Sequence, residues 1–118
     1  MLRAITYLNV PQLNHLRMVT DFEQQVYKLC KKIPKGKVST YGEIANALSS
    51  KCARAVGNAL NKNPYAPVVP CHRVVRSNGE VGGFASGQKN KIKILKKEGI
   101  EIKGNQIVNF NKRFKKLK

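Results

Sequence analysis

The sequence predicts an α+β fold that is mainly helical, with a helix-turn-helix followed by a small hairpin and a C-terminal helix. Three observations predict it: two short amphipathic segments separated by three residues, a tight-turn SNG after an apolar run, and a last apolar-periodic segment that ends at a glycine. The 118 residues, 42 % of them hydrophobic, suffice for one modest core. We expect one domain over residues 21–110, after a short segment of uncertain structure at 1–20 and before a basic tail at 111–118.

The first helix is predicted over DFEQQVYKLCKKI, which begins at Asp21. Its apolar residues fall on one face at helical spacing: Phe22, Val26, Leu29, Cys30 and Ile33. Asp21 can cap its start, and Pro34 and Gly36 end it. Because Cys30 lies on the apolar face, we expect it in the core.

Two short segments then form the predicted helix-turn-helix. STYGEIANALSS has Ser39 or Thr40 as its N-cap, and Ser49–Lys51 separate it from CARAVGNALNKN. Small residues dominate the second helix: Ala53, Ala55, Gly57 and Ala59. Such a helix lies close to something bulky, and the sequence leaves open whether this is a duplex groove or the rest of its own domain.

The remaining segments predict short elements. VVPCHRVV is apolar and broken by proline, so we expect it to be extended or irregular and partly buried. SNG predicts a tight turn that joins short hairpin strands, with EVGGF on the far side. ASGQKNKIKILKKEG predicts the last helix, terminated by Gly99, and IEIKGNQIVNF predicts two strands around Lys103-Gly104. NKRFKKLK is a basic run, which we expect to be a frayed or solvated end.

Charge is the strongest compositional signal. Lys and Arg number 23 against six Asp and Glu, for a formal net charge of +17. A polyanionic partner, either nucleic acid or an acidic membrane surface, explains this imbalance, and a general compositional preference for lysine is the alternative. No apolar run reaches membrane-spanning length, and residues 1–10 lack the apolar core of a secretion signal. Three scattered cysteines fit neither a disulfide framework nor a four-ligand zinc site, and indicate a reducing, intracellular setting.

Cys71 and His72 are neighbours in the segment PVVPCHRVVRSNGEVGGF. A cysteine attacks as its thiolate, which a nearby base or cation favours. Neighbouring side chains of an extended segment point in opposite directions, so a local turn or a bridging water would have to connect the two. A histidine that acts as a base also needs an acceptor for its other ring nitrogen. Glu98 is the most interesting acid, because the last turn of a helix is unfavourable for an anion.

Four stretches together resemble the O6-alkylguanine-DNA alkyltransferases. PCHRVV followed by SNGEVGGF is similar to the active-site signature of that family, and GKVSTYGEIA to the turn into its first DNA-binding helix. ARAVGNALNKNP is similar to its recognition helix and the asparagine segment beyond, and KKEG to the segment with its buried glutamate. These stretches cover residues 21–103 in the family's order. The resemblance implies a winged-helix-like, DNA-binding helix-turn-helix domain.

The resemblance also implies roles for individual residues. Cys71 resembles the alkyl-accepting nucleophile, His72 the base that works through a water, and Glu98 the carboxylate that orients it. Asn63 resembles the asparagine that braces the active-site turn. Tyr41 resembles the tyrosine that crowds a phosphate and donates to a flipped base, and Arg54 the finger inserted into the base stack. Further DNA contacts are implied for Gly42, Ala53, Gly57 and Ser77. A base pocket is implied from Tyr41, Val74, Phe84 and Ala85.

The implied function is direct DNA repair. The family flips O6-alkylguanine out of duplex DNA and transfers the alkyl group irreversibly to its cysteine, once per molecule and without a soluble cofactor. We expect a monomer that binds no membrane and acts in the cytoplasm, with the nucleoid if the source is prokaryotic. The range of alkyl groups, and the acceptance of O4-alkylthymine, stay open.

Departures from the family pattern limit this carry-over. Phe84 stands where many relatives have tyrosine, and Ala85 where some have a serine that bonds the lesion oxygen. The resemblance does not extend to the N-terminal domain that many relatives carry, so we expect neither that domain nor a metal site within it. Two other classes remain: a non-catalytic lesion-recognition protein and a plain helix-turn-helix regulator. The first typically has tryptophan in place of the cysteine, and the second leaves the Pro-Cys-His-Arg segment unexplained.

Overall fold

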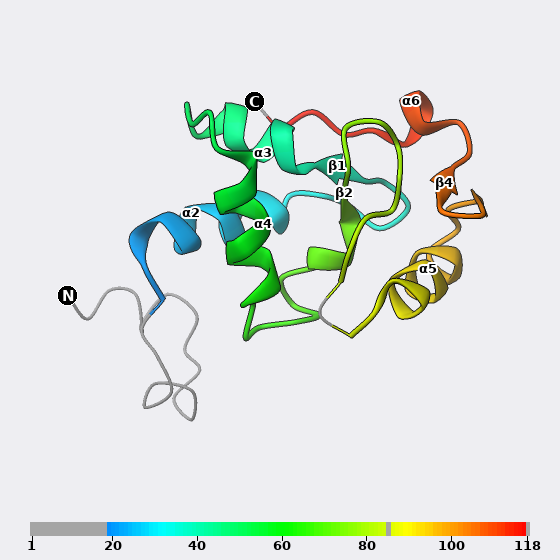
Figure 1. Ribbon diagram of the computed structural model, residues 1–118, viewed down its shortest axis with the longest axis horizontal. Helices are drawn as coiled ribbons and strands as arrows, with labels where there is room; N and C mark the ends of the chain where they lie inside the picture. Colours follow the sequence, from blue (N-terminus) through cyan, green and yellow to red (C-terminus); the bar gives the residue numbers. More distant parts are fainter. Residues whose placement is uncertain (1–18, 85, 118) are drawn as a thin grey trace.

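The computed structural model describes residues 19–84 and 86–117. Its first described helix is α2 (Asp21–Cys30), and the helix-turn-helix consists of α3 (Tyr41–Ala47) and α4 (Ala53–Asn61). A single 3-10 turn, η2 (Cys71–Arg73), precedes the longest C-terminal helix, α5 (Gln88–Lys97). Figure 1 shows α3 and α4 crossing on one side of the molecule and α5 on the other, with the strands β1 (Ser39–Thr40) and β2 (Val74–Val75) between them. The α+β class and the helix-turn-helix are as predicted.

The strands are two residues long and form two separate pairs. β1 (Ser39–Thr40) pairs in parallel with β2 (Val74–Val75), and β3 (Ile102–Lys103) pairs antiparallel with β4 (Gln106–Ile107). The predicted pair around Lys103-Gly104 is therefore present. The predicted turn across SNG forms, and Arg76 N–H donates across it to the Glu80 carbonyl at 2.9 Å. The adjoining strand β2 pairs with β1, however, and Glu80 bridges to Gln106. A distant segment supplies the partner, which turn chemistry alone does not reveal.

The N-caps of α2 and α3 are both threonines. Thr20 caps α2, because its side chain accepts from the Glu23 backbone N–H while Glu23 accepts from the Thr20 N–H. The expected cap at Asp21 is therefore shifted by one residue, and Asp21 lies in the first turn, where its charge suits the helix dipole. Thr40 caps α3 in the same way by accepting from Glu43 N–H at 2.9 Å. This places Tyr41 at the first helical position.

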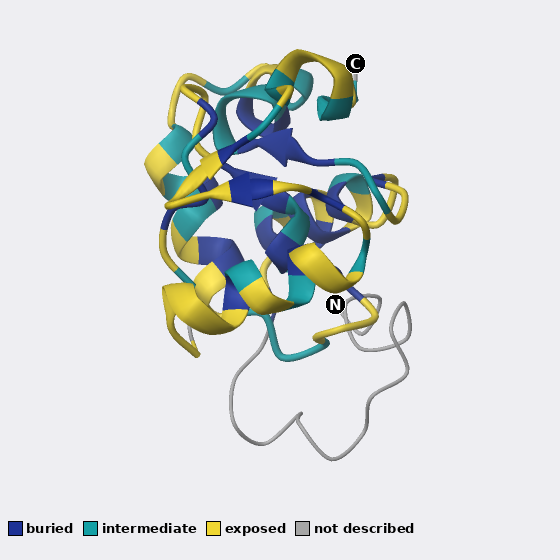
Figure 2. Cartoon of the chain, turned by 90° about the vertical axis from the view of Figure 1, so that its right-hand side faces the viewer, coloured by how far each residue is buried: buried dark blue, intermediate teal, exposed yellow. Residues whose placement is uncertain are grey.

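β2 divides the core into two clusters. Val74 packs with α2, α3 and α4, in a cluster that includes Val26, Ile44 and Val56. Val75 packs on the other side, with residues of α5 and the β3–β4 hairpin. This division follows from the alternation of side chains along a strand. Figure 2 shows the buried residues on the strands and on the inward sides of the helices. No helix of the described residues is long and apolar enough to cross a membrane.

The basic tail is more ordered than expected. Its first residues form α6 (Phe110–Arg113), which starts before the expected boundary at residue 111. Phe114 then bridges to Val38, and Lys115 N–H donates to the Val38 carbonyl at 2.7 Å. Further on, Leu117 N–H donates to a Glu43 carboxylate oxygen at 2.7 Å. Figure 1 shows this segment, in red, running back from α6 toward α3. Backbone pairing with Val38 and a hydrogen bond to the Glu43 side chain thus hold the tail through residue 117.

Candidate active site and nucleic-acid interface

Cys71 lies on η2, which begins after Pro70 and leads directly into β2. Its backbone N–H donates to the Val69 carbonyl at 2.9 Å. Successive side chains of a 3-10 helix are rotated by about 120°, not placed on opposite sides as in a strand. His72 is buried, with 5 % of its surface exposed, whereas Cys71 is partly exposed. The turn therefore leaves Cys71 partly exposed and directs the imidazole into the protein.

The imidazole of His72 contacts Glu98, which caps the C-terminal end of α5. Its Nε2 lies 3.0 Å from Oε2 of Glu98. Burial alone would raise the pKa of Glu98, but hydrogen bonds from Arg73 and His72 outweigh burial and hold that pKa below its usual value. Because an ionised carboxylate only accepts hydrogen bonds, Nε2 of His72 carries the proton. Whenever the imidazole is neutral, Nδ1 is then the nitrogen that can accept a proton.

Sequence reasoning missed Arg73, which holds the same carboxylate. Its Nε donates to Oε1 of Glu98 at 2.9 Å, and its Nη2 donates to Oε2 at 2.8 Å. Nη1 donates to the Ile33 carbonyl, just beyond α2, at 2.9 Å. This bidentate geometry is the strong form of an arginine–carboxylate pair. Apart from its place in PCHRVV, nothing in the sequence indicates this role for Arg73, because its partner lies 25 positions away.

Asn63 fixes the loop that leads to Cys71. Its side-chain Nδ2 donates to the Val69 carbonyl at 2.9 Å, and its Oδ1 accepts from Tyr65 N–H at 2.9 Å. The Val69 carbonyl also accepts from Cys71 N–H. A single side chain thus ties together both ends of the segment 63–69. This is the bracing geometry that the resemblance implies for Asn63.

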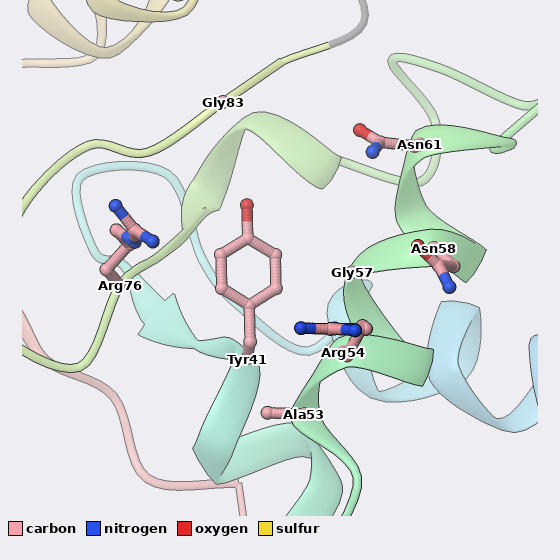
Figure 3. A pocket seen from close by; sticks show the side chains of 8 residues that line it. All are labelled: Tyr41, Ala53, Arg54, Gly57, Asn58, Asn61, Arg76 and Gly83. Carbon is pink, nitrogen blue, oxygen red and sulfur yellow. The ribbon is translucent and has the colours of Figure 1, made fainter.

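A pocket of about 460 Å³ opens beside the helix-turn-helix (Figure 3). Tyr41 stands in its centre, with Arg54 of α4 pointing toward it on one side and Arg76 on the other. Three residues predicted to contact DNA besides Tyr41 line it, namely Ala53, Arg54 and Gly57, and the others are Asn58, Asn61, Arg76 and Gly83. Asn58, Asn61 and Arg76 were not predicted. The two asparagines could have been found, because they follow Arg54 at helical spacing along α4.

Two glycines make room around Tyr41. A Cβ on Gly57 would lie 3.9 Å from Cδ1 and Cε1 of Tyr41, so the ring rests on the bare backbone of α4. A Cβ on Gly42 would lie 3.3 Å from Oγ of Ser77, which is tight. Ser77 is exposed and close to the start of α3. The predicted residues Gly42, Gly57 and Ser77 therefore gather around the N-terminus of one helix.

Lys91 is a second residue that sequence reasoning missed. It is fully buried, and its Nζ donates to the Val74 carbonyl at 2.7 Å, to the Gly83 carbonyl at 3.1 Å and to Oη of Tyr41 at 3.4 Å. Burial lowers the pKa of Lys91 to about 8. Burial, with a further contribution from Cys71, also raises the pKa of Tyr41. Lys91 connects α5, β2, the 82–84 loop and the tyrosine at the pocket.

The other residues predicted for the base pocket are placed as follows. Val74 is fully buried, and its carbonyl accepts a hydrogen bond from Lys91 Nζ. Phe84 is half-buried, with its ring centroid 6.0 Å from Lys91 Nζ. Ala85 lies outside the described residues. Cys30 is buried in the first core cluster as expected, and within residues 19–84 and 86–117 no group of three or more His, Cys, Asp or Glu side chains is placed to hold a metal ion.

These features define a class: a helix-turn-helix domain with a partly exposed cysteine next to a His–Glu pair. The family model described as 6-O-methylguanine DNA methyltransferase, DNA binding domain, matches residues 21–100. The chain belongs to this family.

Relatives and solved structures agree with this membership. The chain is 49 % identical over 81 residues to a methylated-DNA–protein-cysteine methyltransferase of Methanosarcina acetivorans, covering 68 % of this chain and 52 % of the relative. A methylated-DNA–protein-cysteine methyltransferase of Methanothermobacter thermautotrophicus is 39 % identical over 85 residues, which cover 72 % of this chain and 48 % of the relative. The chain thus spans about half the length of these curated relatives.

Several of the similar solved structures contain DNA. An S. pombe protein in complex with damaged DNA containing O6-carboxymethylguanine superposes with a TM-score of 0.73 at 35 % identity, covering 81 % of this chain and 95 % of that one. A Mycobacterium tuberculosis protein in complex with DNA superposes with a TM-score of 0.65 at 44 % identity, covering 67 % and 50 %.

Proposed function

We propose that this protein repairs O6-alkylguanine in duplex DNA by transferring the alkyl group to Cys71, once per molecule. It acts as a monomer and needs no soluble cofactor. The observation that carries the proposal is the placement of the partly exposed Cys71 on a turn whose next residue, His72, bonds Glu98. Membership of the methyltransferase family and the names of the relatives support the same reaction.

The pocket beside α4 supports a flipped-nucleotide mechanism. The alkyl group on a stacked guanine is inaccessible to in-line attack by sulfur, so the nucleotide has to leave the stack. Extrusion costs a few kcal/mol, which phosphate contacts and an inserted side chain offset. Arg54 is exposed on α4 and reaches toward Tyr41, so it fills the gap in the stack. Tyr41 lies in the pocket beside α4, and the family resemblance assigns Val74 and Phe84 to the same base site.

The alkyl transfer forms one bond, breaks one bond and moves one proton to His72. The bond between sulfur and the alkyl carbon forms while the bond between that carbon and O6 of guanine breaks. Nδ1 of His72 receives the thiol proton through a water, and Glu98 stabilises the imidazolium that results. The restored guanine takes up one proton in place of the lost alkyl group. Because a thioether has no easy route back to the thiol, the protein is consumed.

Labelling tests the proposal directly. Duplex DNA that carries O6-methylguanine with an isotopic label in the methyl group is incubated with the protein. We expect one label per protein molecule, and peptide mapping should place it on Cys71. The variant Cys71→Ala should bind the same duplex without accepting label, because the recognition surface on α3 and α4 stays intact.

Cys52 serves as the matched control, because it is an exposed thiol at the N-cap of α4. The variant Cys52→Ala should accept label as the wild type does. Label on Cys52, or none on folded wild-type protein, would overturn the transfer mechanism. Lesion-specific binding without any label would instead identify a lesion-recognition protein.

A further inference from the structure

We propose that Arg73 is a positioning residue for the transfer reaction: by pairing with Glu98, it leaves His72 neutral and able to act as a base near neutral pH. This inference rests on the proposed function and adds a residue to it. Two nitrogen donors, Arg73 and His72, share the carboxylate of Glu98, and the geometry shows which of them holds it more tightly.

The contacts favour Arg73 over His72. Arg73 engages both oxygens of Glu98, at 2.9 and 2.8 Å, whereas His72 reaches only Oε2, at 3.0 Å. Arg73 is itself anchored by the Ile33 carbonyl, so its fork is fixed in the orientation that the carboxylate needs. The side chains of Arg73 and Glu98 are 17 % and 12 % exposed. At such low exposure, the bidentate pair is only weakly screened by solvent.

Charge explains why this sharing matters. A carboxylate that lies beside an imidazole and has no other cation as partner stabilises the imidazolium. The imidazole then keeps its second proton to higher pH. A protonated His72 cannot accept the thiol proton. Arg73 is permanently charged and compensates the charge of Glu98. Glu98 therefore orients His72 through Oε2 without holding it in the protonated form.

Other titratable groups near this segment do not change charge below neutrality. Lys91 of α5, Cys30 of α2 and Tyr41 of α3 are the groups coupled to Cys71. The pKa of Lys91 is lowered to about 8, by burial above all, and burial raises the pKa values of Cys30 and Tyr41. None of these three groups therefore changes its charge on going below about pH 7.

The test compares the pH dependence of the rate of alkyl transfer in wild type, Arg73→Gln and Arg73→Lys. Gln keeps hydrogen-bond donors but loses the charge, and Lys keeps the charge. We expect the acid limb of the Arg73→Gln profile to move to higher pH by about one unit, with the rate recovering in alkaline solution. Arg73→Lys should keep the limb near the wild-type position.

The double variant Arg73→Gln, Glu98→Gln separates charge from structure. Its acid limb should return toward lower pH, because the carboxylate that retained the proton is gone. Arg73→Gln with an unshifted limb and a uniformly slower rate would overturn the inference and assign Arg73 a structural role. If Arg73→Gln does not fold, the same comparison is made with Arg73→Lys alone and with Arg73→Lys, Glu98→Gln. If the acid limb has the same position in these two variants, with and without Glu98, the inference is overturned equally. Failure of the wild type to accept label would instead reject the proposed function.

Discussion

A lysine ammonium is among the costliest groups to bury, yet Lys91 is fully buried beside the candidate base pocket. Two carbonyl groups accept from its Nζ, and Oη of Tyr41 lies within 3.4 Å. The rings of Tyr41 and Phe84 also face it, with centroids 5.7 and 6.0 Å from Nζ. These contacts compensate part of the lost hydration. Lys91 thereby fixes the position of Tyr41 relative to β2 and the 82–84 loop.

The stability of the protein should record this buried charge. The pKa of Lys91 is about 8 in the folded protein against 10.5 as its ordinary value, so the folded state releases the proton first. Below about pH 8 both states are protonated and the cost of burial is fully present, and above it the folded state gains stability until the unfolded state also deprotonates. Between about pH 7 and pH 9.5, wild type should gain about 2 kcal/mol relative to Lys91→Met.

Urea denaturation at both pH values measures this gain. Lys91→Met serves as its own reference, because the loss of packing and hydrogen bonds is a constant offset that does not depend on pH. A difference between the two proteins that stays flat from neutral to alkaline pH would show that Lys91 remains charged in the folded state.

At the scale of one element, the start of α3 sets the position of Tyr41. The helix is only seven residues long, so it depends on its cap and on tertiary packing rather than on its own propensity. Thr40 is buried, belongs to β1 and accepts from Glu43 N–H. It therefore joins the strand pairing with β2 to the first turn of α3. Tyr41 follows directly.

Replacing Thr40 tests the cap. Thr40→Val keeps the shape of the side chain but loses the hydroxyl, which should destabilise the protein by about 1–2 kcal/mol in urea denaturation. Thr40→Ser keeps the hydroxyl and should lose clearly less, since only a methyl group is removed. Equal losses in the two variants would mean that packing of the methyl group, not the cap, holds the start of α3.

At the scale of the whole molecule, a net charge of +17 on 118 residues requires an explanation outside the fold. The acidic side chains are largely committed. Glu98 is held by Arg73 and His72, Glu23 closes the cap of α2, and Glu43 accepts from Leu117 N–H. Many basic side chains are therefore available to a polyanion. A duplex seated at the pocket beside α4 would meet Arg54 and Arg76 on its two sides.

Binding to DNA should accordingly weaken steeply with salt. The logarithm of the association constant for a duplex should fall linearly with the logarithm of the salt concentration, by about 0.9 for each phosphate neutralised. Arg76→Gln should reduce the magnitude of this slope by about one contact, whereas Arg76→Lys should preserve it. Fluorescence anisotropy over a salt series gives the slope. Identical slopes for the two variants would place Arg76 outside the phosphate-binding surface.

The order of elements and the candidate nucleophile could be predicted from sequence because their signals are local. Apolar spacing marks α2, α3 and α5, and PCHRVV with its flanking stretches marks the cysteine segment. The pairing of β2 with β1 and the ordering of the tail on Val38 are long-range backbone contacts, for which the sequence carries no local mark. That is why sequence reasoning finds neither the strand that pairs with β2 nor the ordering of the tail.

By itself, the sequence determined the family, the helix-turn-helix and the residues that can do chemistry, since residue type and spacing are enough for these. Only the tertiary structure decided which basic side chains enter the site. Lys91 lies on the inward face of α5 together with Leu95, and this helical spacing is the one hint in the sequence that Lys91 is buried. No comparable spacing marks Arg73. A cation among 23 acquires its role only from the carboxylate or carbonyl groups that the fold brings to it. Charge acts through distance in space, and the chain order does not fix that distance.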